Sequence, residues 1–471
     1  MFPVRDAAHE GENMNPTHNT NRKHTMTAFI RSYIPVVRSL ARQALNPSQL
    51  KKPLGKMAFW AALAALPLAG GATAWATNGY QFIGVGQCAM GMGGAVVAAP
   101  CDPMTALSNP AGLAWLPSQT AFSGEIFNPT RRANYGFGNI GSNTNVYVAP
   151  ALGWSAPAIH PNIYFGGGIY GTSGMGVNYL QPNTPMGTVQ AYSSLNFMQM
   201  APALAYKMDD TLSVGIALDG GAEQVSFNQT FGGVGFNLSS PSWAYGVGAT
   251  VGVMYKESKK VTIGASYKSE MLFTQLHWNE TSEFMPTGFN SGTGQPTGIA
   301  GGPGTYSARL NYPQQVAFGV ALHPVPELTI STEGQWINWH KTMNQFTVHG
   351  PWTGMPFVAL PLDWQNEWVG NLGLQYDTGK TMQWRAGFNY GGNPIKNADT
   401  QANMIMPAVV TTAVTFGATQ KLPMRWTLTE AVMHTFQNSV TDGPLLGITG
   451  LAPTQSSLTE NSIGFQIGYF F

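Results

Sequence analysis

Charged residues are scarce in this chain of 471 residues, at 10% of the total. Nine of the 23 basic residues precede Met57, and after it 14 basic residues stand against 19 acidic ones. A mildly acidic remainder has the wrong sign to track phosphates, which excludes nucleic-acid binding. Because 44% of the residues are hydrophobic and 11% are aromatic, the chain can bury a large core and is not disordered.

Long apolar runs are also lacking. After residue 76 no stretch holds 18 consecutive apolar residues, so the chain is not predicted to cross a membrane as helices. The apolar run 57–68 has 12 residues, follows three lysines within 51–56 and precedes the small-x-small sequence 74–76. This arrangement is typical of a secretory signal peptide, cleaved after Ala76.

The alternative for this run is a buried N-terminal helix. Residues 1–56 are polar and interrupted by proline, so they form either a long start to the signal or a segment upstream of an initiation at Met57. We therefore interpret 1–76 as an N-terminal extension and signal peptide and leave it out of the fold.

The rest of the sequence repeats segments of about ten residues in which large apolar residues alternate with small or polar ones. In the last segment, Phe465 and Ile467 alternate with Gly464 and Gln466. Small and polar residues suit a barrel lumen, and large apolar residues suit lipid. Fourteen such segments occur, near 119–129, 145–158, 162–172, 190–207, 211–226, 241–256, 260–273, 313–322, 327–339, 367–378, 382–390, 411–421, 425–436 and 461–471.

The connections between these segments alternate in length. Tight turns fall at 158–161, 208–210, 257–259, 323–326, 378–381 and 422–424. Long connections include 274–312, 340–366, 391–410 and 437–460. A soluble β-propeller or β-sandwich, the alternative, has no reason to alternate so regularly. We predict an all-β fold over 118–471, a transmembrane antiparallel β-barrel of about 14 strands in a Gram-negative outer membrane, with its short turns in the periplasm.

Residues 77–117 precede the first strand and do not alternate. They are rich in glycine and alanine and hold the motif Asn109-Pro110-Ala111. A segment that is neither strand nor long helix, attached to a barrel with a lumen, is expected to lie inside it as a plug, here called the hatch.

The hatch resembles a known family. Its run 84–95, followed by Asn109-Pro110-Ala111, is similar to the N-terminal hatch of the FadL/TodX family of outer-membrane transporters for long-chain fatty acids and aromatic hydrocarbons. The terminal Phe471 is similar to the residue that the outer-membrane barrel assembly machinery reads in such proteins. The resemblance implies a monomer that meets a hydrophobic small-molecule ligand, outer-membrane lipid and lipopolysaccharide.

The segment 168–179 resembles the third strand of that family, in which a glycine-containing kink is followed by a tyrosine. This chain differs at the kink, where Pro-Phe-Gly is common in the family. The resemblance implies that an apolar ligand leaves sideways through the kinked strand, and we expect the opening at Gly171, Ser173, Gly174 and Gly176. In this interpretation Asn109 hydrogen-bonds the exposed strand edge. The alternative is that these glycines are ordinary small lumen residues.

Motifs for catalysis are missing. The run from Gly84 to Ala89 formally matches a dinucleotide fingerprint, but no strand precedes it and no βαβ unit follows. His-Glu-x-x-His, Cys-x-x-Cys and Gly-x-Ser-x-Gly sequences do not occur, so we predict no enzyme, no cofactor and no metal site. The alternative is an outer-membrane lipid hydrolase with a serine and histidine pair on the barrel wall.

Cysteine is nearly absent, and both cysteines, Cys88 and Cys101, fall in the hatch. In an oxidising compartment they form either a disulfide that closes a short stretch or two small buried thiols.

Alternation places four charged residues in the lumen, Asp219, Lys268, Glu333 and Arg385. So few charges, with a plug, favour passive uptake of hydrophobic compounds over a general porin. Lys268 or Arg385 would hold the carboxylate of a fatty acid, or would serve only to solvate the lumen. The alternative functions are a porin-like or adhesive outer-membrane barrel.

Overall fold

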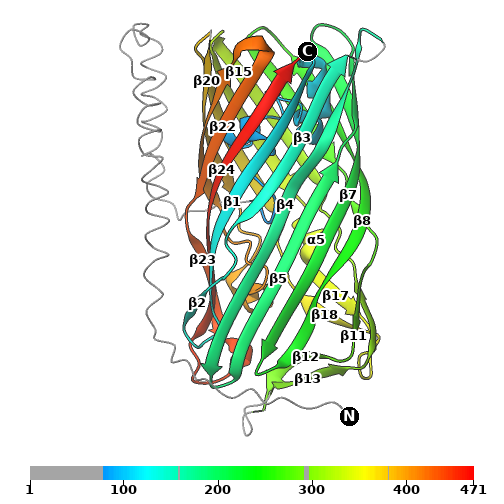
Figure 1. The fold of residues 1–471 in the computed structure, drawn as a ribbon, viewed down its shortest axis with the longest axis vertical. Helices are drawn as coiled ribbons and strands as arrows, with labels where there is room; N and C mark the ends of the chain where they lie inside the picture. The colour runs from blue at the N-terminus through cyan, green and yellow to red at the C-terminus, as the bar shows by residue number, and fades with distance from the viewer. Residues whose placement is uncertain (1–77, 158–159, 291–295, 380) are drawn as a thin grey trace, which may run out of the picture. The chain divides into compact units, whose positions relative to one another are not determined.

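The computed structural model describes residues 78–157, 160–290, 296–379 and 381–471, all within one compact unit that spans 74–471. The predicted signal peptide and its cleavage after Ala76 lie outside these residues. Within them, fourteen strands of one antiparallel sheet form a ring (Figure 1). The predicted all-β barrel of about 14 strands is therefore confirmed.

Every predicted strand segment corresponds to one strand of the ring. The ring strands are β1 (Gln119–Asn134), β3 (Tyr147–Pro157), β4 (Ile163–Thr184), β5 (Gly187–Met200) with its continuation β6 (Ala203–Lys207), β7 (Leu212–Phe231), β8 (Val234–Lys256), β9 (Val261–Lys268), β15 (Gln315–Val325), β16 (Leu328–Ile337), β19 (Glu367–Asp377), β20 (Met382–Gly391), β21 (Thr412–Lys421), β22 (Trp426–Thr435) and β24 (Pro453–Phe470). Three short strands extend the sheet, β2 (Asn139–Gly141), β10 (Leu272–Phe273) and β23 (Asn438–Pro444). β1 pairs with β24 from Gln119 opposite Phe470 to Asn134 opposite Gln455, which closes the ring.

The alternating sequence produces a two-faced wall. On β1 the side chains of Phe122 and Ile126 are 60% and 42% exposed, whereas Ser123 and Glu125 between and beside them are buried. An exposed apolar face is stable when lipid rather than water covers it. The same pattern continues on β24, where Ile467 points outward, as predicted.

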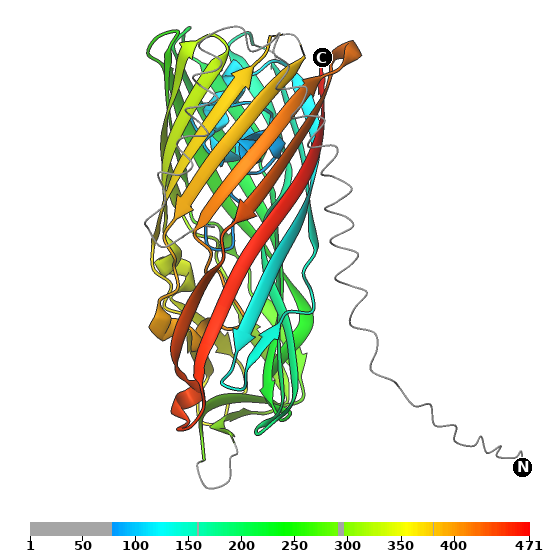
Figure 2. The same ribbon diagram turned by 90° about the vertical axis from the view of Figure 1, so that its left-hand side faces the viewer.

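The strands differ greatly in length around the ring. β4 and β8 have 22 and 23 residues, whereas β16 and β20 have 10 each. Figure 2 shows the long strands running on past the ends of the short ones, at the end of the barrel opposite the C-terminus. The tight turns lie at the C-terminal end. Because short turns face the periplasm in bacterial outer-membrane barrels, we expect this end to be periplasmic and the long strands to project on the outer side.

The long outer connections are not irregular loops. They contain β11 (Leu276–Glu280), β14 (Gly304–Ala308), β17 (Gln345–His349) and β18 (Phe357–Pro361), which form a four-stranded sheet, the hairpin β12 (Glu283–Phe289) and β13 (Pro296–Gly301), and the helices α5 (Trp339–Met343), η3 (Asn397–Asp399), η4 (Gln401–Asn403) and η6 (Leu445–Gly447). Trp278, Tyr306 and Trp352 are buried among these segments and belong to the same apolar cluster as wall residues such as Phe227 of β7. At the periplasmic end the short helix η5 (Pro423–Arg425) forms a turn.

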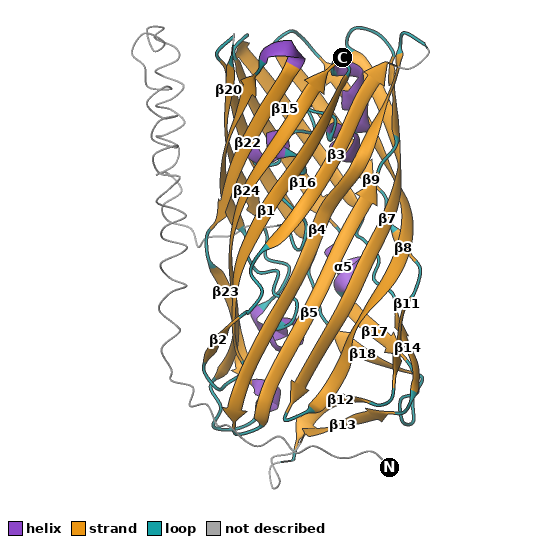
Figure 3. Cartoon of the chain, in the orientation of Figure 1, coloured by secondary structure: helices purple, strands orange, loops and turns teal. Residues whose placement is uncertain are grey.

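The hatch lies inside the ring. It consists of α3 (Gln87–Gly91), α4 (Thr105–Ser108) and η2 (Pro110–Trp115), and Figure 3 shows these as short helical segments within a wall of strands. Glycines on the lumen face make room for it. A side chain at Gly264 would collide with the carbonyl oxygen of Val97, and one at Gly464 would collide with the side chain of Gln87. In the described residues no helix has both the length and the hydropathy needed to span a membrane.

Candidate transport site

The hatch motif anchors the plug to the barrel wall. Asn109 is fully buried, and its side-chain amide donates to the carbonyl oxygens of Val97 (2.7 Å) and Val253 (3.2 Å), while its Oδ1 accepts from the backbone N–H of Ala111 (3.2 Å). Pro110 then begins η2 with its ring at the first helical position, where no N–H is needed. The structure therefore corrects the expected contact, because Asn109 bonds to β8 and to the hatch itself, and not to the edge of β4.

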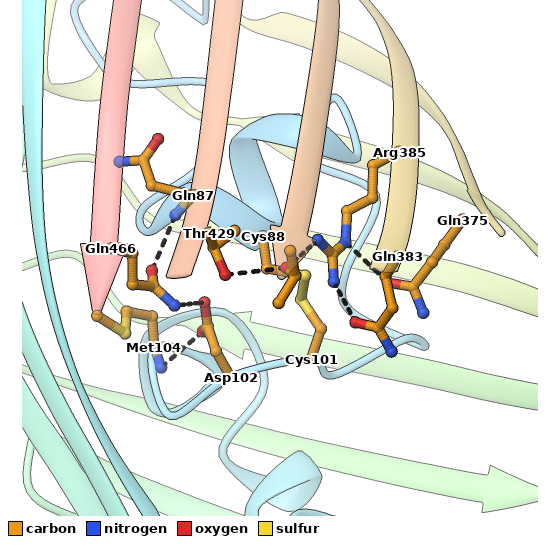
Figure 4. The surroundings of a disulfide bond; sticks show 11 residues. Gln87, Cys88, Cys101, Asp102, Met104, Gln375, Gln383, Arg385, Thr429 and Gln466 are labelled. Atoms are coloured by element: carbon orange, nitrogen blue, oxygen red, sulfur yellow. Dashed lines mark hydrogen bonds between the residues drawn. A yellow bond between two sulfur atoms is a disulfide. The ribbon is translucent and has the colours of Figure 1, made fainter. Parts of the chain in front are cut away.

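Cys88 and Cys101 are joined by a disulfide, with their Cα atoms 6.3 Å apart. Gln87 and Asp102, which adjoin the two cysteines in the sequence, both hydrogen-bond to Gln466 on β24 (Figure 4). Oε1 of Gln466 on β24 accepts from the backbone N–H of Gln87 at 3.0 Å, and its Nε2 donates to Asp102 at 3.1 Å. The disulfide thus ties together two parts of the hatch that share one anchor on the wall.

Asp102, the residue after Cys101, is buried. Its carboxylate accepts from the backbone N–H of Met104 at 3.0 Å as well as from Gln466. Burial raises the pKa of Asp102 to about 6, although these hydrogen bonds and the positive charge of Arg385 oppose the rise. The hatch therefore holds a carboxyl group that titrates close to neutral pH.

The two predicted head-group residues have different surroundings. Each nitrogen of Arg385 has a partner, because the side chain donates to Gln375 (2.7 Å), Thr419 (2.6 Å) and Gln383 (3.0 Å). Figure 4 shows the first and last of these residues around it. The side chain of Lys268 forms no hydrogen bond or ion pair within 4 Å among the described residues, and with Asp102 and Glu333 it lines a cavity of about 110 Å³ between the hatch and the wall. Of the two, Lys268 is the one free to meet a ligand.

The other two predicted lumen charges, Asp219 and Glu333, are hydrogen-bonded within the protein. Asp219 accepts from the hydroxyl of Thr250 at 2.6 Å. Glu333 accepts from the backbone N–H groups of Val96 (3.0 Å) and Val97 (2.9 Å), which holds the middle of the hatch against β16.

A large apolar cavity lies in the outer half of the unit and was not predicted. Its volume is about 280 Å³, and no Asp, Glu, Lys, Arg or His side chain lines it. Its main apolar lining residues are Met175, Leu195, Val225, Phe227, Phe231, Phe236, Met285, Leu310, Met343, Phe346, Leu360, Ile405 and Met406. Flexible, polarisable methionines and aromatic rings suit apolar ligands of varied shape.

The wall changes beside this cavity. β3 and β4 pair only as far as Ala151 opposite Tyr170, and Thr172 forms a β-bulge in the pairing of β4 with β5. Beyond that point β4 continues to Thr184 without β3 (Figure 1). We call this interruption between residues 147–150 of β3 and 171–178 of β4 the seam. It coincides with the predicted kink.

The glycines of the kink differ in what they require. A Cβ at Gly176 would lie 2.6 Å from the carbonyl oxygen of Ser193, so the close approach of β5 excludes a side chain there. Cβ atoms at Gly171 and Gly174 would meet their nearest atoms at 3.4 Å, an ordinary contact, and neither residue has a positive φ. Packing thus does not demand glycine at 171 or 174. Ser173 points to the inside, where its hydroxyl lies 2.7 Å from that of Tyr312.

The start of the described hatch covers the inner side of the seam. The backbone N–H of Phe82 donates to the carbonyl oxygen of Thr172 (3.1 Å), and the N–H of Gly174 donates to the carbonyl oxygen of Tyr80 (3.2 Å). These bonds take the place of the missing β3 partner. The contact that the sequence interpretation gave to Asn109 is therefore made by the segment 80–82.

The C-terminal Phe471 projects from the end of β24. Its side chain is 64% exposed, and its backbone N–H donates to the carbonyl oxygen of Ser118 at 3.0 Å. Ser118 lies in the short link between the hatch and the barrel, since η2 ends at Trp115 and β1 begins at Gln119.

A closed ring with an apolar outer face, a lumen filled by an N-terminal hatch and an apolar cavity on the outer side define a plugged outer-membrane channel. Residues 62–442 match the family model described as outer membrane protein transport protein (OMPP1/FadL/TodX). The chain belongs to this family, whose members are transport proteins of the outer membrane and not enzymes.

Solved structures agree with the fold. A FadL homologue from Pseudomonas aeruginosa is 16% identical, with a TM-score of 0.66 over 83% of this chain and 100% of that chain. The toluene transporter TodX from P. putida is 17% identical (TM-score 0.65; 83% and 99% covered), and the toluene transporter TbuX from Ralstonia pickettii is 18% identical (0.60; 83% and 99%). The comparison with curated proteins found no match.

Proposed function

We propose that this chain carries hydrophobic compounds inward across the outer membrane and releases them sideways, through the seam, into the membrane. Met175 supports the proposal most directly, because it lines both the 280 Å³ apolar cavity and a cavity of about 30 Å³ that Gly174 and Gly176 also line. A ligand in the large cavity is thus one side chain away from the interrupted wall.

Sideways release avoids an energetic cost. An apolar ligand that left through the periplasmic end would return to water at about 0.8 kcal/mol for each CH₂ group. The seam leads to lipid instead, because the outward side chains beside it are exposed and apolar, with Val146 at 65%, Val148 at 69% and Ile169 at 46%.

The cavity favours an uncharged ligand as the main substrate class. With no ionisable side chain in its lining, it offers a carboxylate no partner, and burying an unpaired charge is costly. Two of the similar structures are named as toluene transporters, which fits a neutral aromatic hydrocarbon. We therefore expect toluene to be a better probe than a fatty acid.

Fatty acid is the second candidate, and the unpartnered Lys268 favours it. A carboxylate that reached the 110 Å³ cavity would find an ammonium group that forms no hydrogen bond or ion pair within 4 Å among the described residues, although Asp102 and Glu333 line the same cavity. Replacing Lys268 by Met should then lower the uptake of radiolabelled oleate and leave that of toluene unchanged. Equal uptake of oleate by both proteins would remove this candidate.

The proposal is tested by filling the seam. Gly174→Leu places a large side chain where the wall is interrupted, and it should reduce toluene uptake strongly without reducing the amount of heat-modifiable barrel. Gly370→Leu is a matched control, because a side chain at Gly370 meets nothing within 4 Å and lies on β19. Normal uptake by Gly174→Leu would show that the ligand leaves by another route.

The remaining expectations about partners belong here as proposals. We propose that the assembly machinery reads Phe471, that lipid and lipopolysaccharide surround a monomer, and that the signal is removed after Ala76. The exposed aromatic side chain at the end of β24 supports the first of these.

A further inference from the structure

Beyond the bulge, the free edge of β4 is held by three different partners. The hatch bonds to residues 172 and 174, as described above. Farther out, the backbone N–H of Asn143 donates to the carbonyl oxygen of Asn178 (2.8 Å), and the N–H of Asn178 donates to the hydroxyl of Ser142 (3.0 Å). Between these two contacts the carbonyl oxygen of Gly176 accepts from a single side chain, that of Arg131 on β1.

Arg131 spans the seam. Its Nη1 donates to Gly176 on β4 and also to the hydroxyl of Tyr147 at the start of β3 (3.1 Å), and its Nη2 donates to the carbonyl oxygen of Thr144. The guanidinium carbon lies 5.2 Å from the centre of the Tyr147 ring. The side chain is only 4% exposed, so one buried cation joins β1, the segment before β3 and β4.

Two polar atoms near this contact are buried without partners. One is Nε of Arg131 itself, and the other is Oε2 of Glu460 on β24. Both residues line the 30 Å³ cavity together with Gly174 and Gly176. The sheet register makes them diagonal neighbours, since Pro129 lies opposite Glu460 and Arg131 lies opposite Leu458. They do not form an ion pair within 4 Å in the described structure.

We propose that Arg131 is a two-position latch on the seam, which holds it closed through Gly176 and Thr144 and releases it by turning to Glu460. This inference rests on the proposed sideways release and names the residue that regulates it. Turning to Glu460 joins the two unpartnered atoms and releases the carbonyl oxygen of Gly176, the middle contact on the edge of β4.

The chemistry of the two positions makes a balanced switch. In the closed position the guanidinium donates to two neutral carbonyls and a phenol. In the other it would meet a carboxylate, which gives a shorter and stronger charge-assisted bond but leaves the two carbonyls without a donor. Because each position satisfies groups that the other leaves unpaired, neither is favoured outright, and a passing ligand in the seam can decide between them.

The latch predicts that substitutions at Arg131 and at Glu460 change the rate of toluene uptake in opposite directions. Because the two positions are close in free energy, Arg131→Met, which removes the closed position, should raise the initial rate of toluene uptake about two-fold. Arg131→Lys keeps a donor for one carbonyl and should give an intermediate rate. Glu460→Gln keeps the size of the side chain, weakens the open position and should lower the rate. A purely structural Arg131 would instead lower uptake and barrel yield together.

A disulfide across the seam separates this proposal from sideways release itself. A Cβ at Gly171 would lie 3.5 Å from that of Ala149, a spacing that a disulfide spans. In oxidised Ala149→Cys/Gly171→Cys protein, Arg131→Met should give no gain in uptake. If the disulfide does not reduce uptake in otherwise native protein, sideways release is wrong.

If the disulfide does reduce uptake, the single variants decide the latch. Assembled Arg131→Met protein that takes up toluene no faster than the native chain would overturn it. Should Arg131→Met fail to assemble, Glu460→Gln still gives the answer, and an unchanged or higher rate in that variant would overturn the latch while leaving sideways release standing.

Discussion

At the scale of single residues, burial decides which charges are available for transport. In the sequence Arg385, Glu333 and Lys268 all fall on inward positions. In the structure, however, Arg385 is hydrogen-bonded to the wall and Glu333 to the hatch. Only neighbours from distant parts of the chain reveal this. The same holds for Arg131, which the sequence did not single out, because its partners come from β4 and from the segment before β3.

Asp102 makes the stability of the hatch depend on pH. Its pKa rises from 3.8 to about 6 on folding, so the folded state binds the proton more tightly than the unfolded state. The stabilisation is complete below about pH 4 and is lost as the pH rises to about 6, with an upper limit of about 3 kcal/mol. We predict that thermal unfolding will occur at higher temperature at pH 4 than at pH 7.

Asp102→Asn is the control for this effect. It keeps the shape of the side chain and removes the titration, so the difference between pH 4 and pH 7 should shrink. A pH dependence of equal size in Asp102→Asn and in the native protein would assign the effect to other groups.

At the scale of elements, the ring strands follow from the sequence because their signal is local. Each strand needs only its own alternation, and a turn at each end, to be recognised. The four-stranded outer sheet is different, since β11 and β14 come from one long connection and β17 and β18 from another, and they form a sheet only through pairing across that distance. The apolar cavity was missed for the same reason.

The last strand carries an assembly prediction. The 16 residue pairs between β1 and β24 end at Phe470, so deleting Phe471 removes only one backbone hydrogen bond from the closure. We expect several-fold less assembled barrel, with the unfolding temperature of the assembled fraction nearly unchanged. Quantifying heat-modifiable protein in membranes, with total synthesis as the control, checks this. A normal amount of assembled barrel would contradict a signal at Phe471.

At the scale of the whole molecule, the two ends of the barrel should face different compartments. An epitope tag at Gly354 should be labelled on intact cells. This residue is exposed in the outer connections, and a side chain added there would meet no atom within 4 Å. A tag at Lys259, in a tight turn at the other end, should be labelled only after the membrane is opened. Labelling of the second tag on intact cells would reverse the orientation.

The whole-molecule account depends on the seam being the way out. The measurement that tests it most directly is toluene uptake by Ala149→Cys/Gly171→Cys protein, before and after reduction, beside the native chain under the same conditions. The native chain controls for reduction of its own Cys88–Cys101 disulfide. We predict that the oxidised double variant takes up little toluene and that reduction restores the native rate. Equal uptake by the oxidised and reduced forms would contradict release through the seam.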